Sequence, residues 1–78
     1  MLQVRIVSPE AAVFEGEAGH IIVPGDRGNL GILPGHSPLY ARLIEGTIQL
    51  SAANISSVPI KGGIMRVEAD TVLILTGY

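Results

Sequence analysis

Apolar and polar side chains alternate along much of this 78-residue chain. The clearest alternating apolar positions, with polar residues between them, are Leu2, Val4 and Ile6 near the amino terminus and Ile48 and Leu50 in the middle. Because successive side chains of a strand point to opposite faces, this period of two predicts half-buried β-strands that face one shared core.

One segment near the carboxyl end departs from this alternation. Residues 72–75 read Val-Leu-Ile-Leu without a polar interruption. Continuous apolar runs are typical of strands that are buried on both faces. We therefore expect this strand either to be covered on both faces or to lie against a partner protein.

Turn-forming residues separate the apolar segments at short, regular intervals. Glycine provides positive φ, proline fixes φ, and Asn or Asp side chains bond their own backbone. The predicted turns cover residues 8–10, 15–17, 24–28, 34–36, 45–46, 53–54, 61–63 and 69–70. This spacing leaves room for about eight or nine short strands and no substantial helix, which predicts an all-β sandwich or flattened barrel. At this length we expect a single domain over residues 1–78.

Composition and charge narrow the classes of function. Charged residues make up 15% of the chain, whereas about 25% is usual for a globular domain. So few charges cannot cover a small domain, and we expect exposed apolar surface of the kind that marks protein interfaces. The five basic residues are scattered singly, which argues against nucleic acid as a partner. There is no cysteine, so no disulfide supports the fold.

The residues able to carry chemistry do not form a recognisable active site. His36 and Ser37 are adjacent, but GHSPL lacks the closing glycine of a nucleophile elbow and has Pro38 where the helix would begin. His20 and His36 have no third metal ligand at a recognisable spacing. The glycines of GDRGNLG lead into Ile-Leu-Pro rather than into a helix that would hold phosphate. We expect no catalytic residue, no metal and no cofactor.

The stretch GNLGILPGHSPL, residues 28–39, contains three glycines and two prolines but no formally charged side chain. Such a path is stiff, and a preorganised loop loses little entropy on binding. We interpret the stretch as a docking surface, or in part as a strand that crosses between two sheets. Ile32 and Leu39 are expected in the core and Asn29, Leu30 and His36 outside. The His36 ring either bonds a backbone carbonyl locally or points at a partner.

Three blocks of the sequence resemble one known family. The segment IIVPGDRGNLGILPGHSPL closely resembles the signature V-x-P-G-x-x-G-x-L-G-I-L-P-G-H-x-P-L of the epsilon chain of rotary ATP synthases, whose mitochondrial counterpart is called delta. VRIVSPEAAVFEGEA is similar to the family's opening V-x-x-V-S-P-x-x-x-x-F-x-G-E, and IKGGIMRVEADTVLILT to its later S-G-G-F-x-E-V-x-x-x-x-V-x-V-L-A. The blocks occur in the family's order and nearly cover the chain.

The resemblance implies a flattened two-sheet β-sandwich of about ten short strands, without catalytic residues of its own. In that family the domain lies at the foot of the central stalk, beside the gamma chain and on the cytoplasmic loops of the membrane-embedded c-ring. The implied role is mechanical, because torque passes from the ring through gamma and epsilon to the catalytic head during ion-driven ATP synthesis. The implied location is peripheral, on the cytoplasmic face of the energy-transducing membrane.

The matched motifs also imply site residues. By position in the motifs, Asn29, Leu30 and His36 would face the c-ring, and Ser8 would lie near gamma. The family often has an acidic residue where this chain has Asn29, so we expect a neutral hydrogen bond there rather than a salt bridge to basic c-ring loops. Lys61 stands where serine is common before the double glycine, and nothing in the sequence explains it.

The chain departs from the family at its end. Family members usually continue into a two-helix hairpin that can inhibit ATP hydrolysis and, in some members, bind ATP, whereas this chain stops at Tyr78. We expect the hairpin to be absent and carry over neither inhibition nor nucleotide binding. The alternative from another class is a free-standing β-sandwich module that binds a peptide or ligand. Its only aromatic residues are Phe14, Tyr40 and Tyr78, which argues against a sugar-binding platform.

Overall fold

A computed structural model describes residues 1–52 and 57–77, and the regular structure in these residues consists of β-strands. The nine strands are β1 (Leu2–Val7), β2 (Ala12–Ala18), β3 (Ile21–Gly25), β4 (Gly28–Ile32), β5 (Leu39–Leu43), β6 (Gly46–Leu50), β7 (Ser57–Ile60), β8 (Gly63–Glu68) and β9 (Thr71–Thr76). The all-β prediction is confirmed. The same residues contain no helix long and apolar enough to cross a membrane. The turn predicted at residues 53–54 and the aromatic Tyr78 lie outside the described residues.

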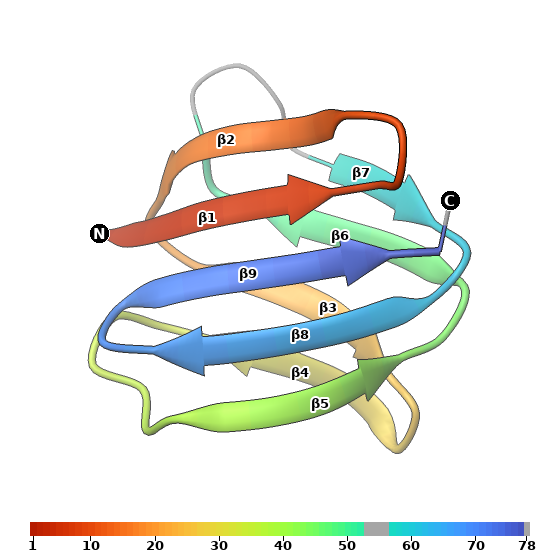
Figure 1. The fold of residues 1–78 in the computed structure, drawn as a ribbon. Helices are drawn as coiled ribbons and strands as arrows, with labels where there is room; N and C mark the ends of the chain where they lie inside the picture. Colours follow the sequence, from red (N-terminus) through yellow and green to blue (C-terminus); the bar gives the residue numbers. More distant parts are fainter. Residues whose placement is uncertain (53–56, 78) are drawn as a thin grey trace.

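The strands form one hydrogen-bonded path that folds back on itself into two layers (Figure 1). β2, β1, β9, β8 and β5 lie side by side in the front layer, and β3, β6 and β7 continue the path behind them, with β4 paired to β3. A single register pair, Gly25 with Leu43, joins β3 to β5 where the layers meet. The extents of 28 × 28 × 17 Å give the flattened shape that the sequence predicts.

The core lies between the two layers, and no polar side chain of the described residues is buried. Its main members are Leu2, Val4, Ile6, Leu43, Met65, Val67, Val72 and Ile74 from the front layer and Ile21, Val23, Ile32, Ile48, Leu50, Val58 and Ile60 from the back layer. The alternating positions named from the sequence are all among them, because each strand turns every second side chain inward. Packing of aliphatic side chains therefore stabilises the domain.

β9 shows how the apolar run at residues 72–75 is used. Val72 and Ile74 are fully buried, whereas Leu75 is 50% exposed and Leu73 is half-buried. β9 is central in the front layer, since it pairs with β1 on one side and β8 on the other. The chain covers only one face of this strand. Of the two expectations for this run, coverage on both faces is therefore wrong for the chain on its own.

One predicted turn is also wrong. Residues 15–17 lie inside β2, where Gly16 is the register partner of Val4 in β1. The glycine serves packing rather than chain reversal, because a Cβ built on Gly16 would come within 3.3 Å of the Phe14 ring. Glycine inside a strand often marks such a close approach.

Candidate interaction surfaces

The residues assigned to the c-ring contact lie on the rim formed by β4 and the loop of residues 33–38. β4 lies low in the back layer of Figure 1 and pairs with β3. Asn29 is exposed, whereas Leu30 is half-buried and packs against the core, so Leu30 is not wholly outside as expected. Ile32 is buried, as expected, and Leu39 is half-buried against the core.

A tight turn closes the loop of residues 33–38. The His36 backbone N–H donates to the Leu33 carbonyl at 3.1 Å, and Gly35 has a φ of 86°. The His36 ring lies 2.7 Å through Nδ1 from the Ser37 carbonyl oxygen, which only accepts, so Nδ1 donates. The local bond is therefore formed, which was the first of the two alternatives for His36. Leu33 is 62% exposed and the His36 side chain is also exposed, so both are accessible from outside.

Ser8 stabilises the connection between β1 and β2. Its Oγ donates to the Ala11 carbonyl at 3.0 Å, and its backbone N–H donates to the same oxygen at 2.9 Å. In Figure 1 this connection lies at the upper right, whereas β4 and β5 lie along the lower edge. β4 and the loop of residues 33–38 therefore lie along one edge of the domain, with the β3–β4 turn at one end of that edge and the loop at the other, and the connection that carries Ser8 lies elsewhere.

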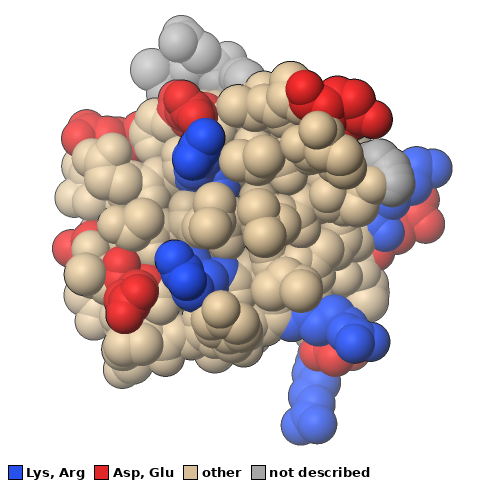
Figure 2. Space-filling view, in the orientation of Figure 1, with Lys and Arg blue, Asp and Glu red and all other residues tan. Residues whose placement is uncertain are grey.

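The outer face of the front layer carries a cluster of apolar side chains, which we call the front patch: Tyr40, Ile64, Leu73 and Leu75. Tyr40 is 71% exposed, Ile64 is 51% exposed, and Leu73 is half-buried. Ile64 is the register partner of Leu75, and Arg66 is the partner of both Leu73 and Tyr40. Figure 2, which looks onto this face, shows a largely uncharged surface with a few isolated charged groups.

Charged side chains border and interrupt the front patch. Arg5 Nε donates to Glu15 Oε2 at 2.8 Å across β1 and β2, and both side chains are more than half exposed. An exposed pair of this kind contributes at most about 1 kcal/mol. Arg66, at the centre of the patch, forms no ion pair within residues 1–52 and 57–77. The guanidinium is available to a carboxylate from another molecule.

The outer face of the back layer has a different chemistry. Its outward positions on β6 and β7 are Thr47, Gln49, Ser57 and Pro59, all exposed. Thr47 is the register partner of Pro59, and Gln49 is the partner of Ser57. Short polar side chains and proline suit contact with water. The outward positions of β6 and β7 are thus polar or proline, whereas Ile22 of β3, the register partner of Gln49, is half-buried on this face. The large apolar side chains that are at least half exposed on the front patch have no counterpart on β6 and β7.

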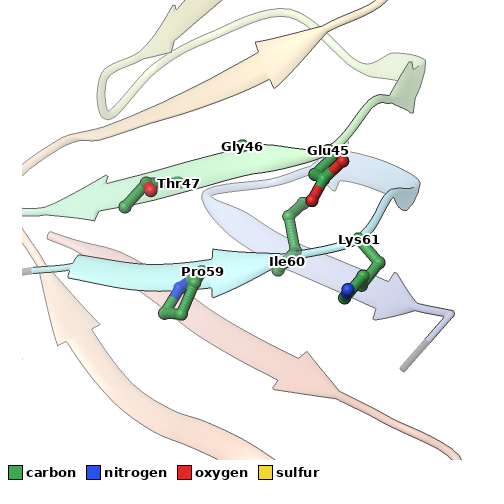
Figure 3. A pocket seen from close by; sticks show the side chains of 6 residues that line it. All are labelled: Glu45, Gly46, Thr47, Pro59, Ile60 and Lys61. Carbon is green, nitrogen blue, oxygen red and sulfur yellow. The ribbon is translucent and has the colours of Figure 1, made fainter.

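A hollow lies where residues 45–47 of the β6 segment face residues 59–61 of the β7 segment (Figure 3). Glu45 and Lys61 lie at one end of it, and Thr47 and Pro59 lie at the other. The hydroxyl of Thr47 is therefore separated from the carboxylate of Glu45, and nucleophilic catalysis needs such groups in contact. Within the described part of the chain, no three His, Asp or Glu side chains gather into a metal site.

The chain matches a known protein family over nearly its whole length. Residues 1–77 match the family described as ATP synthase, Delta/Epsilon chain, beta-sandwich domain. The chain belongs to this family. The resemblance carried by the three sequence blocks is thereby confirmed, and the two-layer arrangement described above is the delta/epsilon β-sandwich.

Curated relatives of this delta/epsilon domain are longer than the chain. The ATP synthase epsilon chain of Bordetella avium is 42% identical over 77 residues, which cover 96% of this chain and 55% of the relative. That of Leptospira borgpetersenii is 37% identical over 78 residues, which cover 99% of this chain and 61% of the relative. The chain thus spans little more than half the length of these relatives.

Solved structures share the delta/epsilon fold at low sequence identity. A chain in the central stalk and c-ring structure of the Tetrahymena thermophila mitochondrial ATP synthase is 18% identical, with a TM-score of 0.84 over 99% of this chain and 63% of that one. A chain of the Euglena gracilis mitochondrial ATP synthase, in an assembly of OSCP, F1 and c-ring, is 20% identical, with a TM-score of 0.86 over 99% and 51%. These likenesses support the fold.

Two parts of the delta/epsilon surface, the front patch and Leu33, were not predicted from the sequence. Tyr40 and Ile64 are single apolar residues far apart in the chain. Only the pairing of β5 with β8 brings them together in the front patch. The low charged fraction and the run at residues 72–75 were the available signals. Leu33 lies in the stretch that the sequence predicts as a docking surface, but it was not named as a contact residue. It is the most exposed large apolar side chain of the loop.

Proposed function

We propose that this delta/epsilon domain is a non-catalytic rotor module of an ATP synthase central stalk. The front patch, together with the turn at Ser8, binds the gamma chain. The rim that carries Asn29, Leu30 and His36 binds the polar loops of the c-ring. Holding both partners at once couples rotation of gamma to the ring during ion-driven ATP synthesis. The relatives named ATP synthase epsilon chain support this assignment.

The contrast between the two large faces carries the proposal. The domain leaves Tyr40, Ile64 and Leu75 at least half exposed on one face, while the outward positions of β6 and β7 on the other face are polar or proline. Full burial of one such aliphatic side chain contributes about 1.5–3 kcal/mol, so covering the exposed halves supplies a useful part of a docking energy. A protein face with aliphatic side chains, and a carboxylate near Arg66, fits this surface.

The rim supports a second, smaller contact. Asn29 offers amide donors and a carbonyl acceptor, so it suits hydrogen bonding to exposed loop backbone. Leu33 adds apolar area beside His36 in a loop whose turn is already formed. Preorganised loops lose little conformational entropy on binding. Contact with c-ring loops would hold the domain at the cytoplasmic face of the energy-transducing membrane.

The proposal predicts that a charge in the front patch weakens docking to gamma. Ile64→Glu places a carboxylate where the partner's apolar surface packs, two positions from Arg66 on the same face of β8. The complex with cognate gamma should weaken at least about tenfold, because the new carboxylate must be desolvated in the interface and competes for the guanidinium that a partner carboxylate would otherwise pair with. Thr47→Glu is the matched control, since it adds the same side chain at an exposed strand position on the opposite face. Size-exclusion chromatography and calorimetric titration measure both variants.

The two variants separate the possible results. Loss of the gamma complex with Ile64→Glu alone supports the front patch as the docking surface. Equal binding by both variants and the unsubstituted chain contradicts that assignment. If the unsubstituted chain forms no complex at high micromolar gamma, the rotor proposal fails, and a free-standing peptide-binding module becomes the better hypothesis.

A further inference from the structure

The turn between β8 and β9 reaches the rim loop through one side chain. Ala69 and Asp70 have φ values of 50° and 61°, and Glu68 pairs with Thr71 on either side of them. Two successive residues with positive φ are what a two-residue type I′ hairpin requires. Asp tolerates this conformation better than most side chains. The hairpin therefore holds Asp70 in a fixed position.

Asp70 links three parts of the fold. Its Oδ1 accepts a hydrogen bond from the Gly35 backbone N–H at 2.7 Å, across 35 positions of sequence. Its carbonyl oxygen accepts a hydrogen bond from the Gln3 N–H of β1 at 2.8 Å. A hydrogen bond from a backbone N–H to a carboxylate belongs to the strong, charge-assisted class. The rim loop is thus fastened to the front layer.

The other hydrogen bonds of residues 33–38 are local. They join the His36 N–H to the Leu33 carbonyl and the His36 ring to the Ser37 carbonyl. In the described residues, the bond to Asp70 is the one hydrogen bond that ties this loop to a distant part of the chain. It acts on Gly35, whose φ of 86° defines the turn between exposed Leu33 and exposed His36.

We propose that Asp70 is a positioning residue that holds Leu33 and His36 of the rim loop in the arrangement that docks on a second protein. This inference rests on the proposed function, in which that protein is the c-ring. Asp70 itself need not touch the ring. Without its carboxylate the loop keeps its two ends and its local turn, but it must lose more conformational freedom when it binds.

Two substitutions separate the hydrogen bond from the hairpin geometry. Asp70→Gly keeps a residue suited to positive φ but removes the acceptor. Asp70→Asn also tolerates positive φ and keeps a carbonyl oxygen as acceptor. Both should leave the domain folded, which far-UV circular dichroism and thermal melting would verify. The comparison then isolates the acceptor.

The first readout needs no partner. In the free 78-residue chain, nuclear magnetic resonance should show exchange of the Gly35 amide proton at least about tenfold faster in Asp70→Gly than in the unsubstituted chain, because a charge-assisted bond is lost. Asp70→Asn should restore part of the protection, because it keeps a neutral acceptor. Unchanged exchange in Asp70→Gly would show that the hydrogen bond to Asp70 does not hold the Gly35 amide, whatever the partner is, and would overturn the proposal.

The second readout is binding of the domain, in complex with gamma, to detergent-solubilised c-ring. We expect about five- to tenfold weaker binding for Asp70→Gly and an intermediate loss for Asp70→Asn, which keeps a neutral acceptor. A released Gly35 amide with unchanged ring affinity overturns the positioning role. If the unsubstituted complex does not bind the ring, the c-ring assignment fails, and the docking role of Asp70 fails with it. Amide exchange still decides whether Asp70 holds the Gly35 N–H.

Discussion

Gly63 of β8 lies where a side chain would meet the backbone of β9. Its register partner is Thr76, and a Cβ built on it would lie far inside van der Waals contact of the Leu75 carbonyl oxygen. Backbone atoms of a paired strand cannot move aside as a flexible side chain can. The glycine is needed for space, in a double-glycine turn that the sequence marks only as a chain reversal.

We predict that Gly63→Ala lowers the free energy of unfolding by about 2–3 kcal/mol, as overpacking against a rigid neighbour does. Gly31→Ala is the control, because a Cβ there meets nothing within 4 Å and its φ is not positive. The control should change stability by less than about 1 kcal/mol. Urea denaturation of both variants measures the difference, and similar midpoints would contradict the close approach.

At the scale of elements, β9 presents one buried and one largely exposed face, although its residues 72–75 are all apolar. Val72 and Ile74 complete the core, and Leu73 and Leu75 belong to the front patch. A strand buried in the core on one side and in an interface on the other needs apolar residues at every position. The uninterrupted run is thus explained by the proposed gamma contact together with the observed core.

This arrangement predicts opposite sensitivities at neighbouring positions of β9. Ile74→Ala should cost about 2–5 kcal/mol of folding stability, because it leaves a cavity in the core. Leu75→Ala should cost less than about 1 kcal/mol in the free domain but should weaken the gamma complex. Chemical denaturation and calorimetric titration report the two effects. Equal losses of stability would mean that the free domain buries both faces of β9.

An element can be predicted from the sequence when the pattern that indicates it lies within a few neighbouring residues. β1 and β6 were predicted because inward positions such as Ile6 and Ile48 alternate with polar ones, and burial follows directly from period two. The turn at residues 15–17 was predicted wrongly, because glycine signals chain reversal and close packing equally well. Only the position of the Phe14 ring distinguishes the two.

The candidate surfaces were less accessible to sequence reasoning. Motif position led to Asn29 and His36, and both are exposed on the rim. The front patch and the bond from Asp70 to Gly35 depend on which strands become neighbours in the sheet. Pairings across 35 residues leave no periodic trace in a single sequence. They follow only from the three-dimensional order of the strands.

For the whole molecule, the flattened shape separates the proposed partners. The front patch covers one broad face, and the rim lies along β4 and the loop after it, so the two contacts use different surfaces. A domain of this thickness is able to hold two partners without competition between them. The proposed rotor coupling requires that gamma and the c-ring are bound at the same time.

We predict that substitutions on the two surfaces affect one partner each. His36→Ala should weaken c-ring binding several-fold and leave gamma affinity unchanged, and Ile64→Glu should do the reverse. The effects should add in the double variant, since the sites share no contacts. Surface plasmon resonance with each partner separately immobilised tests this. Loss of both partners from either single variant would indicate one shared surface or a folding defect.

The parallel pairing of β1 with β9 has a consequence for synthesis on the ribosome. Gln3 to Val7 pair with Thr71 to Leu75, so the first strand made waits for the last strand of the sandwich. At about 5–20 residues per second, that wait lasts roughly 4 to 14 s. During this time β1 can pair with β2 on one side, but its other edge lacks β9 and its inward side chains remain open to chaperones. The nascent sandwich cannot be completed strand by strand as it emerges, and its final closure comes late, when β9 inserts between β1 and β8.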